Sequence, residues 1–148
     1  MSLHAILGSR DYPDLDQVIH RVQLLHARHG HRWILVSGGS RGVCQTAEAA
    51  HLARGGRVIS LRPVRRPAQA GERCFGADEW RLQPGLPPEK ICHPLEWLSF
   101  RDAAMWRSML IAERAEHGDM FWDGRSFGSA MEIDFFAAAG TPLKIYGR

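Results

Sequence analysis

The sequence repeats one short unit, in which an apolar strand leads into a loop of glycine, serine and arginine and then into a helix. In the first copy the apolar run LHAIL (residues 3–7) is followed by the loop Gly-Ser-Arg-Asp (8–11). After Pro13, apolar residues recur at helical spacing as far as Gly30. Short apolar strands that alternate with helices predict a parallel sheet with helices on both faces.

The later copies keep the same order of elements. We expect a strand at 33–36, a helix from the loop 37–42 to the glycines at 55–56, a strand at 58–61, a helix over about 101–116, a strand at 120–122, a helix to about 139 and a strand at 143–146. The sequence therefore predicts a single domain over residues 1–148, of class α/β, with a mostly parallel sheet of about five strands.

The segment 63–94 breaks this regularity. It contains prolines at positions 63, 67, 84, 87, 88 and 94 and no sustained hydrophobic period. We therefore expect an irregular, Pro-rich excursion here, of a length that usually carries function or packs on a partner.

Cysteine usage and hydropathy indicate the class of environment. The cysteines Cys44, Cys74 and Cys92 are odd in number and form no C-x-x-C pair, so we expect reduced thiols and a cytoplasmic protein. No apolar run approaches the roughly 20 residues of a membrane span, and we expect no membrane association. The net charge of +3 is mild and does not by itself name a partner.

Ligands of open parallel sheets bind where strands end and helices begin. Loops of matching composition follow three of the expected strands, and their glycines, hydroxyls and guanidinium groups suit a phosphate-bearing ligand. The sequence lacks both the G-x-x-x-x-G-K-[ST] and the G-x-G-x-x-G fingerprints. The candidate ligand-binding residues are Gly8, Ser9, Arg10, Ser37, Gly38, Gly39, Arg41, Gly42, Gly124, Arg125, Ser126, Gly128 and Ser129.

Two stretches carry a family resemblance. ILGSRDY with ILVSGGSRGVCQTAEAAHLARGGRVISL, and FWDGRSFGSAMEIDFFAAAGTPLKIY, resemble the two halves of the SLOG superfamily, which joins the DNA-processing protein DprA and the Lonely Guy phosphoribohydrolases. WDGRS-x-G is especially similar to a small branch of single-domain members. The resemblance implies a Rossmann-like three-layer sandwich that binds a nucleotide or nucleotide-derived ligand, without a further cofactor, and a homodimer that pairs through helices.

The resemblance also has departures and alternatives. DprA proteins carry an Asp after Arg-Gly (RGID), where this chain has Val43-Cys44. The usual Arg-Asn pair is also absent, with Arg101 or Arg107 as possible substitutes. The Lonely Guy motif PGG-x-GT-x-x-E survives as residues 125–132, ending at Glu132. One alternative function is therefore a nucleoside 5'-monophosphate phosphoribohydrolase with Glu132 at the glycosidic carbon and an arginine on the phosphate. A solvated helix residue is the simpler interpretation of Glu132.

Other features are weighed in the same way. Arg62-x-x-Arg65-Arg66, with Arg73 and Trp80, would suit single-stranded DNA, the second alternative, although a solvated loop is the simpler interpretation. The run His26-x-x-His29-x-His31 has no accompanying carboxylate, so we expect no metal site. Core positions are predicted for Met105, Trp106 and Met109.

Overall fold

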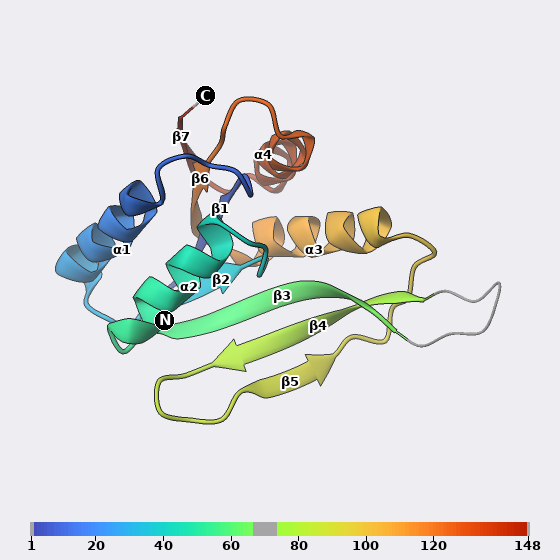
Figure 1. Cartoon of the computed structure of the whole chain (residues 1–148), viewed down its shortest axis with the longest axis horizontal. Helices are drawn as coiled ribbons and strands as arrows, with labels where there is room; N and C mark the ends of the chain where they lie inside the picture. Colours follow the sequence, from blue (N-terminus) through green and yellow to red (C-terminus); the bar gives the residue numbers. More distant parts are fainter. Residues whose placement is uncertain (1, 67–73, 148) are drawn as a thin grey trace.

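The computed structural model of the chain describes residues 2–66 and 74–147. It contains a sheet of seven strands in the order β5-β4-β3-β2-β1-β6-β7 (Figure 1). The strands are β1 (Leu3–Gly8), β2 (Ile34–Ser37), β3 (Arg57–Arg65), β4 (Phe75–Leu82), β5 (Glu89–Cys92), β6 (His117–Phe121) and β7 (Leu143–Tyr146). The helices are α1 (Leu15–His29), α2 (Val43–Ala53), α3 (Phe100–Arg114) and α4 (Phe127–Ala139).

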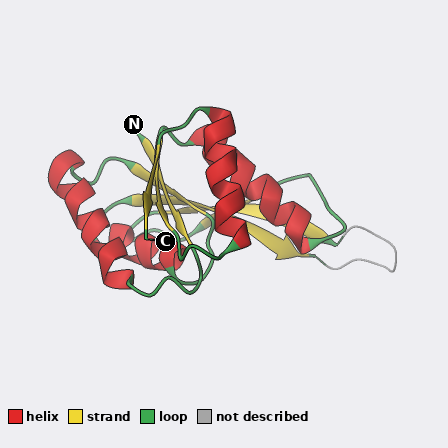
Figure 2. Ribbon diagram, turned by 90° about the horizontal axis from the view of Figure 1, so that it is seen from above, coloured by secondary structure: helices red, strands yellow, loops and turns green. Residues whose placement is uncertain are grey.

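The sheet lies between two layers of helices, as Figure 2 shows. Helices α1 and α2 pack together on one face, and α3 and α4 pack together on the other. Strands β3, β2, β1, β6 and β7 run parallel, whereas β4 and β5 are antiparallel additions at one side. The predicted α/β, Rossmann-like sandwich is confirmed.

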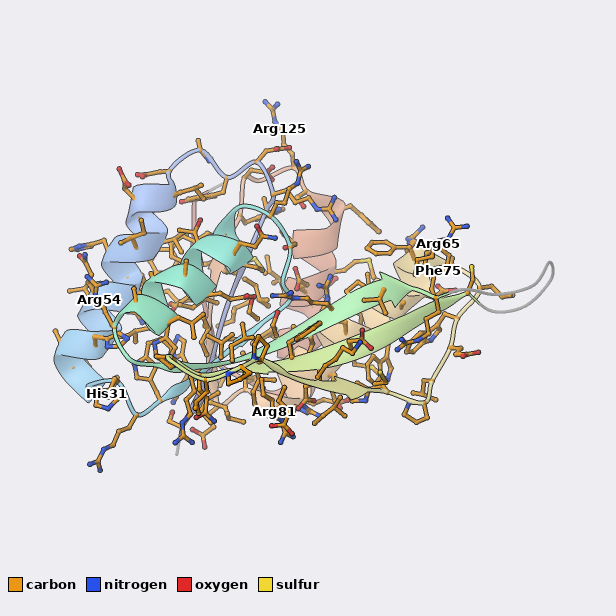
Figure 3. The ribbon with its side chains drawn as sticks, turned by 60° about the horizontal axis from the view of Figure 1, so that its bottom comes forward. His31, Arg54, Arg65, Phe75, Arg81 and Arg125 are labelled. Atoms are coloured by element: carbon orange, nitrogen blue, oxygen red, sulfur yellow. The ribbon has the colours of Figure 1, made fainter. Side chains whose placement is uncertain are left out.

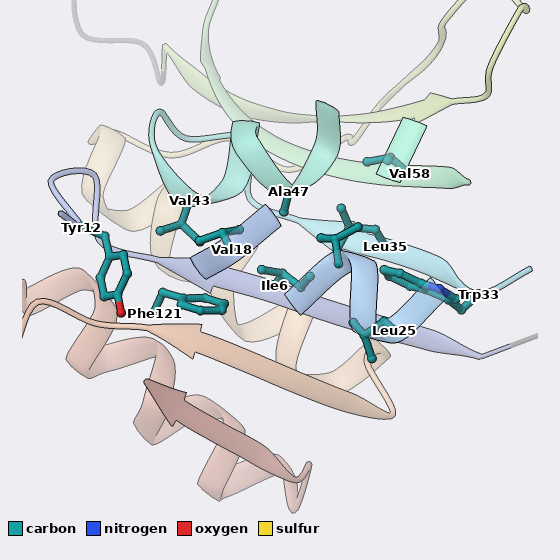
Figure 4. Packing of buried hydrophobic residues seen from close by; sticks show 11 residues of the cluster. Ile6, Tyr12, Val18, Leu25, Trp33, Leu35, Val43, Ala47, Val58 and Phe121 are labelled. Carbon is teal, nitrogen blue, oxygen red and sulfur yellow. The ribbon is translucent and has the colours of Figure 1, made fainter. Parts of the chain in front are cut away.

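Alternating side chains of the central strands supply two cores. Ile6 of β1 faces the α1 and α2 layer, in a cluster with Val18 and Ala47 that Figure 4 shows. Its neighbour Leu7 faces the opposite layer, where Ile111 of α3 joins the same cluster. This alternation follows from the period of two in a strand, and it explains why the continuous apolar runs are buried on both sides.

The helix ends follow local chemistry. Asp14 accepts a hydrogen bond from the backbone N–H of Gln17 at 3.2 Å and caps α1, and Gly30, with a φ of 71°, ends it. Four helices were expected from the sequence, and each forms within a few residues of its expected bounds. Within the described parts of the chain, no helix is long and apolar enough to cross a membrane.

The prediction of an irregular segment at 63–94 and of about five strands was wrong. Strand β3 continues to Arg65 and pairs antiparallel with β4, and β4 pairs with β5. Pro63 is tolerated because β2 pairs with β3 only as far as Ser60, so beyond that point β3 has a single pairing partner. Residues 67–73, and with them Arg73, lie outside the described residues.

The predicted core position of Met109 was also wrong. Its side chain on α3 is 40% exposed, whereas Met105 and Trp106 are half-buried. The apolar residues of α3 are spread around the helix, and Ser108 and Ala112 take the buried positions instead.

Candidate functional site

The three glycine-containing loops lie at one edge of the sheet. Strand β1 pairs in parallel with β2 on one side and with β6 on the other, so the loops after Gly8, Ser37 and Phe121 are neighbours. From β1 the chain leads through α1 on one face, and from β6 through α4 on the other. The crevice between these loops is therefore the topological switch point, where ligands of open α/β sheets bind.

A cleft of about 970 Å³ occupies this position. Of the residues that sequence analysis proposed, Gly8, Arg10, Arg107, Arg125, Ser126, Gly128, Ser129 and Glu132 line it. The other proposed residues do not line it: Ser9, Ser37, Gly38, Gly39, Arg41, Gly42, Gly124 and Arg101. Arg101 instead lines an adjoining hollow of about 320 Å³ between α3 and α4, with its guanidinium 5.3 Å from the centre of the Phe127 ring.

A serine junction holds the first and third loops together. The buried hydroxyl of Ser9 accepts a hydrogen bond from the backbone N–H of Asp123 at 3.1 Å and lies 3.2 Å from the hydroxyl of Ser129. The Ser126 hydroxyl lies 3.3 Å from the same Ser129 oxygen. These contacts fix the start of α4 against the end of β1.

The turn before α4 is shaped by Asp123. Its carboxylate accepts the backbone N–H groups of Arg125 at 2.9 Å and of Ser126 at 2.8 Å. These N–H donors, that of Ser126 first, lower the pKa of Asp123 below its usual value. Ser126 then caps α4 by accepting from the N–H of Ser129 at 3.4 Å, and the indole N–H of Trp122 donates to the Ser126 carbonyl at 3.1 Å.

The glycines of the second loop have packing reasons that the sequence alone does not show. A Cβ on Gly38 would lie 2.7 Å from Arg107 Nη1, and the same nitrogen donates to the Gly38 carbonyl at 2.5 Å. Gly39 has a φ of +70°, and a Cβ there would lie 2.6 Å from Arg62 Cγ. Gly42 has a φ of +82°, and a Cβ there would lie 2.5 Å from the Arg10 carbonyl oxygen. These glycines bring the first and second loops, Arg107 and β3 into contact.

Glu132 is half-buried in the cleft wall. Its carboxylate accepts a hydrogen bond from the Ser108 hydroxyl at 3.2 Å. Burial raises the pKa of Glu132 above its usual range, and the positive charge of Arg107 and the Ser108 hydroxyl oppose this only in part. A carboxyl group with a raised pKa beside a guanidinium is an arrangement found at functional sites as well as in structural networks.

Charges in the cleft balance. Arg10, Arg107 and Arg125 line it together with the carboxyl groups of Asp11, Asp123 and Glu132. Within residues 2–66 and 74–147, none of the three arginines forms an ion pair. In Figure 3, Arg125 projects from the top of the molecule, so its charge sits at the rim.

Several lining residues were not proposed from the sequence. Among them are Ser40 and the aromatic side chains of Tyr12, Phe100 and Trp122. Tyr12 and Trp122 directly flank the first and third loops, so adjacency to a glycine loop was a usable signal for them. Phe100 comes from the start of α3, whose approach to the cleft follows from tertiary packing alone.

The arginines of the predicted DNA patch are engaged elsewhere. Arg62 pairs with Glu48 at 3.1 Å, and Arg66 pairs with Asp78 at 2.8 Å. Arg65 remains exposed beside Phe75, as Figure 3 shows, with its guanidinium 6.0 Å from the ring centre. The Arg62 guanidinium also lies 5.8 Å from the ring of Trp80.

Solved structures share this fold. TM1055, a structural genomics target, superposes with a TM-score of 0.62 at 15% identity, over 97% of this chain and 72% of that one. DNA processing protein A (DprA) from Helicobacter pylori, described for its single-stranded DNA binding mode, gives 0.65 at 21% identity over 99% and 66%. DprA from Streptococcus pneumoniae gives 0.68 at 17% identity over 98% and 50%.

The chain thus has the fold of the DprA proteins, as its resemblance to the SLOG superfamily implied, and spans 66% and 50% of those two chains. At these identities the likeness establishes the fold alone. No protein-family model matches the sequence, and no curated protein sequence does.

Proposed function

We propose that the protein binds a nucleotide or nucleotide-derived phosphate ligand in the cleft at the carboxyl edge of the sheet. The observation that carries this proposal is the combination found at the switch point: a cleft of about 970 Å³, the start of α4, and arginines without ion pairs among the described residues. Such a cleft lies in the usual size range of small-molecule sites.

The start of α4 supplies the phosphate donors. Ser129 N–H is taken by Ser126, whereas the N–H groups of Phe127 and Gly128 have no partner among residues 2–66 and 74–147. Free N–H groups at a helix start, with the helix dipole behind them, favour a phosphate. Arg10 and Arg107 add charge, and the partly exposed rings of Phe100 and Trp122 offer surfaces for a base.

Thermal denaturation with a nucleotide panel tests the proposal. AMP, ADP-ribose or a related nucleotide should raise the melting temperature, since a ligand at a hundredfold excess over its Kd stabilises the folded state by about 2.7 kcal/mol. Arg10→Ser should weaken the shift, whereas Arg54→Ser, on an exposed arginine far from the cleft, should leave it unchanged. No shift with any nucleotide at millimolar concentration would contradict the proposal.

A phosphoribohydrolase activity is the second candidate, favoured by Glu132. The carboxyl group lines the cleft, and the positive charge of Arg107 favours its ionised form against the burial that raises its pKa. A carboxylate near C1′ would stabilise an oxocarbenium-like transition state. In this case nucleoside monophosphates release free base, and Glu132→Gln abolishes release while the melting temperature is retained. Release that persists in Glu132→Gln would remove Glu132 from the chemistry.

Single-stranded DNA binding is the third candidate, and we expect it to be weak. Arg62 and Arg66 are neutralised by carboxylates, which leaves Arg65 as the exposed cation of the patch within the described residues. A DNA site needs several cationic contacts and loses affinity steeply with salt. Submicromolar, salt-sensitive binding that Arg65→Ala removes would reverse this ranking.

We infer that the protein forms a homodimer through α3 and α4. Phe127 is 63% exposed and Met109 is 40% exposed, and both lie on these two helices. Helix α4 is rich in apolar residues, yet only Ser129 and Phe136 are buried within the chain. Light scattering should give a dimer, and Phe127→Ser should shift it toward a monomer, whereas Leu86→Ser, on the far β4–β5 turn, should not.

A further inference from the structure

The opposite edge of the sheet carries a second concave surface. Two hollows of about 260 and 420 Å³ lie where β1, β6 and β7 begin and α1 ends. Both are lined by His4, Leu25, His29 and His117, so they form one continuous depression, which we call the basal hollow. It shares no lining residue with the cleft at the carboxyl edge.

The basal hollow is strongly basic. Arg21, Arg28, Arg32 and Lys144 line it, and Asp119 is the carboxylate among its lining residues. In the described parts of the chain, Arg28, Arg32 and Lys144 form no ion pair. The cleft at the other edge, by contrast, has equal numbers of arginines and carboxyl groups.

The Asp119 carboxylate holds neighbouring side chains of the hollow in place, and these partners compensate its negative charge. Its buried carboxylate contacts His4 Nε2 at 2.6 Å, and it accepts from Arg21 Nε at 3.0 Å and from the Tyr146 hydroxyl at 3.0 Å. Burial would raise the pKa of Asp119, but the hydrogen bond and charge of His4, and then those of Arg21, outweigh it and lower the pKa. The negative charge is therefore retained and compensated, and Arg21 is held at a fixed position.

We propose that the basal hollow binds a small polyvalent oxyanion of the phosphate class. Guanidinium, ammonium and imidazole groups from separate elements converge on one depression, and they supply the donors that a phosphate group requires. Leu25 and Trp33 form apolar walls beside them. A merely solvated basic surface would have no need of a concave shape or of a buried carboxylate that fixes one arginine. This site is independent of the function proposed for the cleft.

Calorimetric titration of the protein with inorganic pyrophosphate tests the site. Arg28→Ser with Lys144→Ser removes two exposed charges from different elements and should weaken binding about tenfold or more, since a hydrogen bond to a charged group is worth about 1.5–3 kcal/mol. Arg54→Ser with Arg65→Ser is the matched control, because it removes the same charge from exposed positions elsewhere and should leave binding unchanged.

Further measurements separate this site from the cleft. The ring signals of His29 and His117 in NMR spectra should shift with pyrophosphate, and Arg10→Ser, in the cleft, should not alter that shift. Titration with glycerol 3-phosphate distinguishes the two sources of the anion. If it binds more tightly than pyrophosphate, the ligand is an organic phosphoester. If it binds more weakly, the ligand is an inorganic anion. Absence of binding at millimolar pyrophosphate, equal loss in the control pair, or loss in Arg10→Ser would each overturn the proposal.

Discussion

Gly128 is a glycine whose missing side chain leaves open space at the start of α4. A Cβ there would have no atom within 4 Å, and the residue lines the cleft. Gly128→Ala should therefore raise the free energy of unfolding slightly, by up to about 1 kcal/mol, because alanine loses less backbone freedom in a helix. If a phosphate approaches the Gly128 N–H, the same methyl group should weaken nucleotide affinity. Denaturation and titration of one variant measure both effects, and unchanged affinity would place the phosphate elsewhere.

Gly39 is required for a different reason, which is backbone conformation and crowding. Its φ is +70°, and a Cβ would lie 2.9 Å from the Ser60 hydroxyl as well as close to Arg62. Gly39→Ala should lower the free energy of unfolding by about 1–2 kcal/mol from the positive φ alone, with the crowding in addition. Gly85→Ala is the matched control, since Gly85 has a φ of +73° and nothing within 4 Å. Equal losses in urea denaturation would show that crowding at Gly39 has no cost.

At the residue scale, the sequence predicted where the cleft would lie but not why each residue is there. The loops with Ser9 and Ser126 meet at one edge because parallel strands end together, which follows from the hydrophobic pattern. The neighbours of Gly38 and Gly39 come from α3 and β3, and no local pattern shows such contacts. The same limit hid Phe100, which reaches the cleft from a distant helix.

Helix α4 allows its capping to be separated from its ligand contacts. Ser126 and Ser99 cap α4 and α3 in the same way, by accepting the N–H three residues later at 3.4 and 3.1 Å. Ser126→Ala and Ser99→Ala should each lower the free energy of unfolding by about 1 kcal/mol. Only Ser126→Ala should also weaken nucleotide binding, since Ser99 does not line the cleft. Equal nucleotide affinities in the two variants would argue against a ligand at the start of α4.

Elements marked by local signals were predicted well, whereas strands that depend on distant partners were not. Helix α1 has apolar residues at helical spacing between an Asp cap and a glycine, and all of these signals are local. The β3–β4–β5 extension has prolines in and around it and carries charged residues such as Glu79. The Glu79 side chain is buried and forms an ion pair with Arg114 at 2.7 Å. Strand pairing and ion pairs across 35 positions leave no trace in a short window of sequence.

At the scale of the whole molecule, acid should destabilise the fold through His51. This fully buried ring lies 3.0 Å from the Trp33 carbonyl through Nε2 and 2.8 Å from His26 Nε2 through Nδ1. Because a carbonyl only accepts, Nε2 of His51 carries the proton and Nδ1 accepts from His26. Burial lowers the pKa of His51 to about 4, so the neutral ring is the form that the fold accommodates.

The sign of the pH dependence follows from this shift. The unfolded chain takes up the proton near the ordinary value of about 6.5, before the folded protein does. The stabilising contribution of the neutral ring is fully present above that pH and is lost as the pH falls toward about 4. The free energy of unfolding should by then have decreased by about 3 kcal/mol. Urea denaturation between pH 7 and 4 should show this decline, and His51→Gln should flatten it. A titration of the His51 ring by NMR near pH 6.5 would contradict the assignment.

The position of β1 between β2 and β6 has a consequence for the order of synthesis. As the chain leaves the ribosome, β1 can pair with β2 once about thirty more residues have been synthesised. The other edge of β1 pairs with β6, for example His4 with His117, so it stays unpaired until β6 has been made. The contacts of Ser9 with Asp123 and Ser129 span 114 and 120 positions. A nascent chain that has completed β3 thus carries a sheet with an open hydrophobic edge, a state prone to aggregation. The last third of the chain closes that edge and forms the cleft in the same step.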